Sequence, residues 1–222
     1  MRLSTSILSI ALSGIATATL GAQAGDGTID RAVAAWAKVK SVRGTFDQTV
    51  TNPIVGTSAT ARGDFAQERP NRLAIRFKAP MTDAIVADGK AVWIYLPSSV
   101  PGQVIKRPAA DRDAVPIDLT GMFLDAPRTK YDISPAAART VDGHSAKGFT
   151  LVPKKGTSAP FTKATVWVDD DDSLIREFEE VETSGVIRHV HLTSMDLNGA
   201  MDRAVFTFTV PSGVKILDQT KP

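Results

Sequence analysis

Residues 67–95, QERPNRLAIRFKAPMTDAIVADGKAVWIY, decide the fold of this chain. Between residues 72 and 77 the apolar side chains fall at every second position, the period of a strand with one buried face. Asp88-Gly89-Lys90 is a hairpin signal, and residues 91–96 after it are rich in β-formers and carry no charge. A strand that is apolar on both faces is covered on both sides. The stretch therefore predicts a sheet wrapped around an interior.

The rest of the chain continues this pattern of short strands and tight turns. Regular strands at such spacing favour antiparallel hairpins over βαβ units. We expect a mainly β (α+β) fold, in which one strongly curved antiparallel sheet forms an unclosed half-barrel. The predicted strands are residues 41–50, 56–67, 72–77, 84–87, 91–96, 103–107, 147–153, 162–168, 174–182, 186–195 and 205–210.

One amphipathic helix is predicted near the start of the chain. Thr28 can cap it, and Ile29, Val33, Trp36 and Val39 follow at helical spacing. Its expected role is packing, sealing one opening of the curved sheet.

A second apolar cluster at roughly helical spacing lies between two β-rich blocks and is closed by Pro127. One interpretation is a core helix that plugs the barrel, and the other is a movable lid over an apolar cavity. Its members are Ile117, Leu119, Met122, Phe123 and Leu124.

Residues 1–24 have the pattern of a secretory signal peptide. Arg2 supplies the positive end, residues 7–20 are apolar or small, and Ala22-Gln23-Ala24 is an A-x-A cleavage site. The apolar stretch is shorter than the roughly 20 residues of a spanning helix. We expect cleavage near Ala24, a periplasmic location, and one mature domain over residues 25–222.

Composition excludes several classes of protein. The chain has no cysteine, so it has no acylation site, disulfide frame or thiol catalyst. Removal of 24 residues from 222 leaves 198, a length that one all-β domain commonly fills. A formal net charge of +2, without a basic stripe, argues against nucleic-acid binding.

Metal and catalytic signals are weak. His189 and His191 lie two apart on one predicted strand face, but no third ligand is visible and His144 lies in an unrelated turn, so a solvent-facing pair is favoured. Residues 169–172, four aspartates, lack the glycine and terminal glutamate of a calcium loop and suit a charged hairpin tip. We predict no metal site, no cofactor and no enzymatic activity, because no catalytic motif unites serine, histidine and aspartate.

Several segments together resemble the LolA family of periplasmic lipoprotein carriers. RPNRLAIRFKAP, DGKAVWIYLP and QVIKR carry the resemblance, supported by GTFDQ, GFTLVPK and FTFTVPSGVKILD elsewhere. Each segment alone is weak, whereas the ordered set covers essentially all of the predicted mature chain.

The resemblance implies an unclosed barrel whose short helices act as a lid over an apolar cavity. It also implies a monomer with three kinds of partner: acylated lipoproteins, the inner-membrane ABC transporter that releases them, and an outer-membrane receptor. In the family, the arginine of the Arg-Pro motif, Arg69 here, holds the lid helices closed through hydrogen bonds. The residues expected to face the cavity are Leu73, Ile75, Phe77, Trp93 and Tyr95, together with the apolar cluster at residues 117–124.

Two alternatives remain open on the same fold. One is a periplasmic lipid-sensing regulator, although such regulators carry a second C-terminal domain and this chain ends soon after its last predicted strand. The other is a carrier of a different lipid or glycolipid. For Arg69, the alternative to the latch is a rim arginine in a surface ion pair that contributes little.

Overall fold

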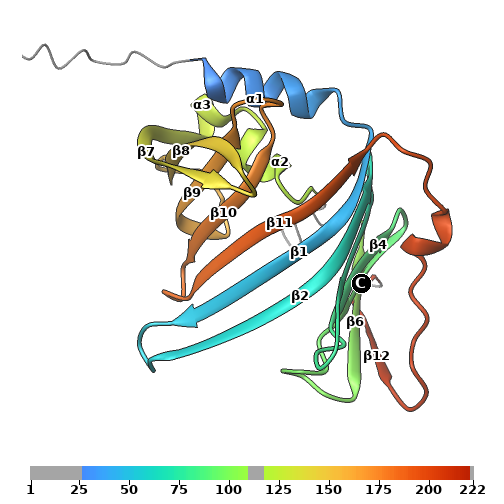
Figure 1. Cartoon of the computed structure of the whole chain (residues 1–222). Helices are drawn as coiled ribbons and strands as arrows, with labels where there is room; N and C mark the ends of the chain where they lie inside the picture. The colour runs from blue at the N-terminus through green and yellow to red at the C-terminus, as the bar shows by residue number, and fades with distance from the viewer. Residues whose placement is uncertain (1–26, 110–117, 221–222) are drawn as a thin grey trace, which may run out of the picture.

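The computed structural model describes residues 27–109 and 118–220. The predicted signal peptide and Ile117 lie outside these ranges. Within them, the chain forms a 12-stranded sheet that curves strongly and does not close, which confirms the predicted fold class (Figure 1). The strand order is β12-β6-β5-β4-β3-β2-β1-β11-β10-β9-β8-β7.

All neighbouring strands in this sheet are antiparallel except β12 and β6, which are parallel. The strands are β1 (Ser41–Asn52), β2 (Thr57–Glu68), β3 (Arg72–Phe77), β4 (Ala84–Asp88), β5 (Ala91–Tyr95), β6 (Gln103–Pro108), β7 (Tyr131–Val141), β8 (His144–Pro153), β9 (Phe161–Asp169), β10 (Ile175–Glu182), β11 (Ile187–Leu197) and β12 (Lys215–Asp218).

Sequence patterns miss β7 and misplace the last strand. In β7 only Tyr131 and Val141 at its two ends are buried, so the strand lacks an alternating apolar signal. The prediction of a strand at residues 205–210 is wrong, because the 3₁₀ helix η1 (Arg203–Phe206) and irregular chain occupy that region. The true final strand, β12, is short and mostly exposed.

Three short α-helices lie together at one end of the curved sheet: α1 (Thr28–Ala37), α2 (Gly121–Leu124) and α3 (Pro127–Lys130) (Figure 1). Gly27, not Thr28, occupies the N-cap of α1. Pro127 does not simply end the second helical region, since it begins α3 at a position where proline's missing N–H is not needed. None of the helices in the described residues has the length and apolarity required to cross a bilayer.

The two faces of the sheet are covered by different parts of the chain. The main core joins α1 and α2 to the concave face of β1, β2 and β8–β11 through residues such as Trp36, Phe123 and Phe178. On the convex face, Phe206 packs against Ala66, Ala74 and Val86. Figure 1 shows the segment after β11, in orange to red, running along the outside of the sheet before β12.

Several strand glycines, among them Gly44 and Gly63, permit the close approach of neighbouring strands. A Cβ on Gly44 of β1 would lie 1.9 Å from the carbonyl oxygen of Ser194 in β11, next to a register shift. A Cβ on Gly63 of β2 would lie 2.5 Å from the carbonyl oxygen of Arg76 in β3. Glycine is needed at both places because backbone atoms occupy the space of a side chain.

We predict that Gly44→Ala lowers the free energy of unfolding by about 3 kcal/mol, the upper range for overpacking, because a backbone carbonyl cannot move without shifting the sheet. Gly27→Ala is the control without a backbone clash, since its Cβ would meet only Arg31 Nη1 at 3.8 Å, and as a change at the N-cap of α1 it should lower the free energy of unfolding by less than about 1 kcal/mol. Urea unfolding followed by circular dichroism measures both. Equal stability of the two variants would contradict the close approach.

Candidate functional site

A cavity of about 640 Å³ opens on the concave side of the sheet. This volume lies within the range of about 300–1,000 Å³ typical of ligand sites. Apolar side chains dominate its wall, and they come from both halves of the sheet and from the segment around α2. Four predicted cavity residues lie in the wall: Ile75, Phe77, Leu119 and Met122.

Three further predicted residues are buried beside the cavity and do not line it. Leu73 is fully buried against Ala87 and Val92. Phe123 and Leu124 belong to the main core, where the Phe123 ring lies 5.1 Å from that of Phe178. The core-helix and lid interpretations of α2 therefore each describe part of it: Phe123 anchors the helix, and Met122 faces the cavity.

The prediction that Trp93 and Tyr95 face the cavity is wrong. Both lie on the convex face, where their rings are 5.7 and 5.8 Å from that of Phe208. Val92 and Ile94, the alternate residues of β5, take the concave side. Because every residue of β5 is apolar or aromatic, its sequence has no alternation that distinguishes the two faces.

Arg69, in the turn between β2 and β3, contacts both α1 and the segment that contributes Leu119 and Met122 to the cavity wall. Its Nη1 donates to the carbonyl oxygen of Trp36 in α1 at 3.0 Å. Its Nη2 lies 3.1 Å from Oδ2 of Asp118, which begins the lid segment, defined here as residues 118–124. The guanidinium also lies 5.2 Å from the centre of the Trp36 ring. The contacts match the geometry expected of a latch, and the latch function itself stays a prediction.

Asp118 is the shared acceptor at this junction, and the sequence patterns do not single it out. Besides Arg69, its carboxylate accepts from Trp36 Nε1 at 3.1 Å and from the backbone N–H of Gly121 at 2.8 Å. The buried side chain of Gln67 accepts from the N–H of Leu119 at 3.2 Å. The available signal was local and weak: a carboxylate close to the start of a helix is favoured by the helix dipole, although Thr120 and not Asp118 occupies the N-cap of α2.

The histidine pair of β11 lies on the convex face, and each member contacts a carboxylate. His189 contacts Glu177, which also contacts Arg139, and His191 Nε2 lies 2.7 Å from Asp142 Oδ2. Both imidazoles are about a third exposed or less. Burial alone would raise the pKa of Glu177, but His189 and Arg139 hold it below the ordinary value. The pair therefore lies partly exposed on the convex face of the sheet, and each member also contacts a carboxylate, which the sequence did not predict.

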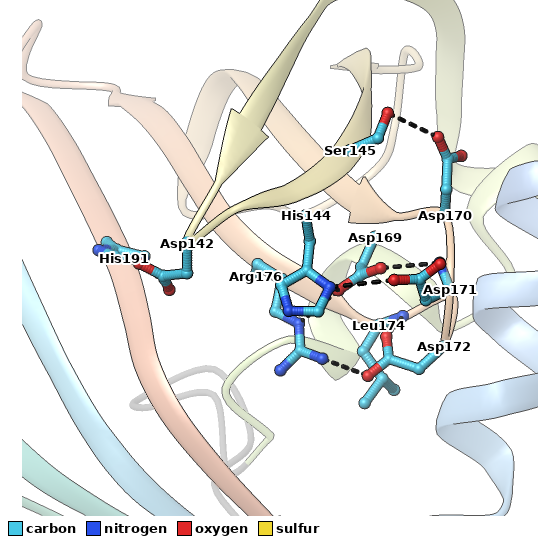
Figure 2. A network of polar contacts seen from close by, with 10 residues as sticks. All are labelled: Asp142, His144, Ser145, Asp169, Asp170, Asp171, Asp172, Leu174, Arg176 and His191. Atoms are coloured by element: carbon cyan, nitrogen blue, oxygen red, sulfur yellow. Dashed lines mark hydrogen bonds and ion pairs between the residues drawn. The ribbon is translucent and has the colours of Figure 1, made fainter.

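The structure brings His144 to the aspartate run, which the sequence did not predict (Figure 2). The turn between β7 and β8 lies beside the turn between β9 and β10, so that His144 Nδ1 is 3.0 Å from Asp171 Oδ2. His144, Asp169 and Asp171 each offer one ligand atom, and these three atoms lie within 4.8 Å of one another. This spacing can hold a metal ion.

Arg176 supplies a cation to the same network. Its Nε donates to Asp169 Oδ2 at 3.0 Å, and it also contacts Asp172 (Figure 2). Burial alone would raise the pKa of Asp169, but the N–H of Asp171 and the Arg176 guanidinium hold it below the ordinary value. The arrangement is accounted for as a polar network that joins two hairpin ends, and we assign it no ligand.

One part of the cavity wall is charged. Glu180 and Arg188 are cross-strand partners on β10 and β11, with Glu180 Oε1 3.3 Å from Arg188 Nε. Arg188 also reaches Glu182 at 2.7 Å and Gln48 at 3.0 Å. Burial raises the pKa of Glu180, and the Glu182 charge adds to that effect while Arg188 opposes it. Ionisation of Glu180 therefore costs free energy in the folded protein.

This raised pKa predicts a pH-dependent stability difference between the protein and its Glu180→Gln variant. Neutral Glu180 favours the folded state below its ordinary pKa of 4.5, and that advantage is lost as the pH rises through the higher pKa of the folded protein. Glutamine stays neutral throughout. The melting temperature of the variant should therefore rise relative to that of the wild type between about pH 4 and 8. Thermal melts across this range test it, and a difference that falls with pH would contradict the burial effect.

Comparisons with known proteins identify the family. The family model described as "Outer membrane lipoprotein carrier protein LolA" matches residues 37–209. The outer-membrane lipoprotein carrier protein of Klebsiella pneumoniae is 30% identical over 189 residues, which cover 83% of this chain and 84% of that protein. The protein of the same name from a Shewanella species is 29% identical over 180 residues, 81% of each chain.

Among solved structures, an uncharacterized conserved protein from Thermus thermophilus has the same fold. It superposes with a TM-score of 0.50 at 12% identity, over 86% of this chain and 97% of that one. The family match spans most of the chain, including the turn that carries Arg69 and the strands that form the cavity. The chain therefore belongs to the LolA family of outer-membrane lipoprotein carrier proteins.

Proposed function

We propose that this protein is a periplasmic carrier that shelters the acyl chains of lipoproteins. It receives them as an inner-membrane ABC transporter releases them, and it delivers them, as a monomer, to an outer-membrane receptor. The observation that carries the proposal is the mostly apolar cavity of about 640 Å³ beneath the lid segment. Membership of a family of carrier proteins supports the same role.

The cavity addresses the physical difficulty of moving a lipid through water. Exposure of an acyl chain costs about 0.8 kcal/mol per methylene, so an unsheltered lipoprotein does not leave one membrane for another at a useful rate. The carrier must also release its cargo, and a pocket that binds too tightly would trap it. A closed, empty state that is stabilised by its own contacts lowers the net affinity for cargo, because those contacts must break before cargo enters.

Arg69 provides such contacts, and the free energy that they contribute is small enough for a lid that opens and closes reversibly. A hydrogen bond to a charged group contributes about 1.5–3 kcal/mol when shielded. Both Arg69 and Asp118 have about a third of their side chains exposed, so solvent reduces the ion pair toward the roughly 0–1 kcal/mol of surface pairs. Burial of a few methylenes is then enough to open the latch, and its reclosure favours release.

We predict that Arg69→Leu loads lipoprotein but fails to pass it on. Leucine donates no hydrogen bonds, so the closed, empty state that competes with the open, loaded state is no longer stabilised. Transfer should fall about tenfold for each ~1.4 kcal/mol by which the closed state is destabilised. Release from inner-membrane vesicles measures loading, and incorporation into outer-membrane vesicles measures transfer. Arg69→Lys should behave more like leucine than like arginine, because lysine lacks the planar fork of donors that reaches both partners.

Arg72→Leu is the matched control for this experiment. Arg72 lies three residues away and pairs with Glu68 at 2.9 Å, at a similar exposure, without contacting α1 or the lid segment through that pair. Its loss should leave both loading and transfer unchanged. Transfer by Arg69→Leu at the wild-type rate would remove the latch from the proposal.

The class of cargo is tested by recovery of the carrier from a native cell envelope. Mass spectrometry of the bound molecules should detect lipoproteins carrying acyl chains. Free phospholipid or glycolipid as the predominant ligand would replace lipoprotein transport with carriage of another lipid, and wild-type protein without any acyl ligand would exclude both.

A further inference from the structure

Glu180 is an unusual residue for the wall of an apolar cavity. Its residue exposure is 8%, and it lines the cavity between Phe178 and Glu182 of the same strand. Oε1 faces Arg188 Nε at 3.3 Å, whereas Oε2 is buried and has no hydrogen-bond partner within residues 27–109 and 118–220. One carboxylate oxygen is therefore buried without a partner, and a rotation of the Glu180 side chain toward the cavity that it lines would let a ligand donor reach this oxygen.

The position of Glu180 places its side chain just inside the cavity rim. Along β10 the concave-facing side chains become more exposed toward the β10–β11 turn: Phe178 is 2% exposed, the Glu180 side chain 11% and the Glu182 side chain 29%. The head of a ligand whose tails extend into the apolar interior would lie at this depth.

The need to neutralise the charge of Arg188 does not by itself explain why a glutamate is buried at position 180. Arg188 Nη2 already contacts Glu182 Oε1 at 2.7 Å, and Nη1 donates to Gln48 Oε1 at 3.0 Å. A second, buried carboxylate beside the same arginine adds desolvation and repulsion from Glu182. A buried acceptor without a partner costs free energy that a donor on a ligand recovers. Sites built in this way discriminate strongly against ligands that lack the matching group.

We propose that Glu180 is a specificity residue that accepts a hydrogen bond, through Oε2, from an N–H donor at the polar head of an acylated ligand. The inference rests on the proposed carrier function and assigns it a ligand chemistry. When it is ionised, the Glu180 carboxylate only accepts, and ester groups only accept, so at a pH above the raised pKa of Glu180 a lipid whose head contains esters alone offers it no donor. An acylated peptide terminus offers an amide N–H when its nitrogen is acylated and an ammonium group when it is free.

Glu180→Gln tests this assignment with almost no change of shape. The amide oxygen is expected to face the Arg188 N–H donors, which places the NH₂ group where Oε2 was. The NH₂ group of the glutamine then faces the N–H group of the ligand, and two donors cannot form a hydrogen bond with each other. Glu179→Gln is the matched control, because Glu179 is the adjacent residue of β10, carries the same charge and does not line the cavity.

The assay measures three ligands with each purified full-length protein. Diphenylhexatriene, a hydrocarbon fluorophore without polar groups, reports whether the cavity is intact. A synthetic triacylated lipopeptide presents the amide N–H, and a diacylated one presents the free ammonium. We expect Glu180→Gln to bind diphenylhexatriene like the wild type and to bind at least one lipopeptide about tenfold more weakly, the loss of one hydrogen bond to a charged group.

The different ligands in the assay show whether the donor is an amide or an ammonium group. They also distinguish failure of the role of Glu180 from failure of the carrier function. Weakening confined to the triacylated lipopeptide identifies the amide, and weakening confined to the diacylated one identifies the ammonium. Wild-type affinity of Glu180→Gln for both lipopeptides overturns the role of Glu180 and leaves the carrier function standing. Wild-type protein that binds neither lipopeptide overturns the carrier function, and the role of Glu180 with it.

Discussion

The carboxylate of Asp118 joins three parts of the chain that are far apart in sequence. It accepts from the indole of Trp36 in α1, from the guanidinium of Arg69 between β2 and β3, and from the backbone of Gly121 in α2. These contacts hold the lid segment against α1 at the end of the cavity. The junction is partly exposed, so solvent screens its ion pair, and we propose that it is stable enough to order the closed arrangement and weak enough to open. The behaviour proposed for the cavity depends on this balance.

Curvature of the sheet is the second requirement, since a flat sheet would leave no enclosed volume. Gly44 and Gly63 allow neighbouring backbones to approach closely where the sheet bends. Phe123 then fills one end of the concave side through its contacts with Phe161 and Phe178, and the remaining volume forms the cavity. The hollow therefore results from an incompletely filled sheet, with a core packed tightly at one end only.

The charged group inside the cavity has a different physical character from the latch. Arg69 and Asp118 lie near the surface, where solvent screens their charges. Glu180 lies where burial raises its pKa, and one of its oxygens has no partner in the part of the chain that the structure describes. The latch is proposed to act on whether the cavity opens. Glu180 is proposed to act on which ligand heads are accepted, and the two roles concern separate ends of the same site.

The sequence by itself determined the curved antiparallel sheet and its major strands, because period-two alternation and turn residues such as Asp88 and Gly89 are local signals. Resemblance to a family also pointed to Arg69 as the residue that would contact the helices. The sequence could not separate the faces of β5, so Trp93 and Tyr95 were assigned to the wrong side, and it missed β7, which has little buried surface. Only the tertiary structure joined Asp118 to Arg69 and left Glu180 with an unpaired oxygen, since those properties depend on which distant residues share one small volume.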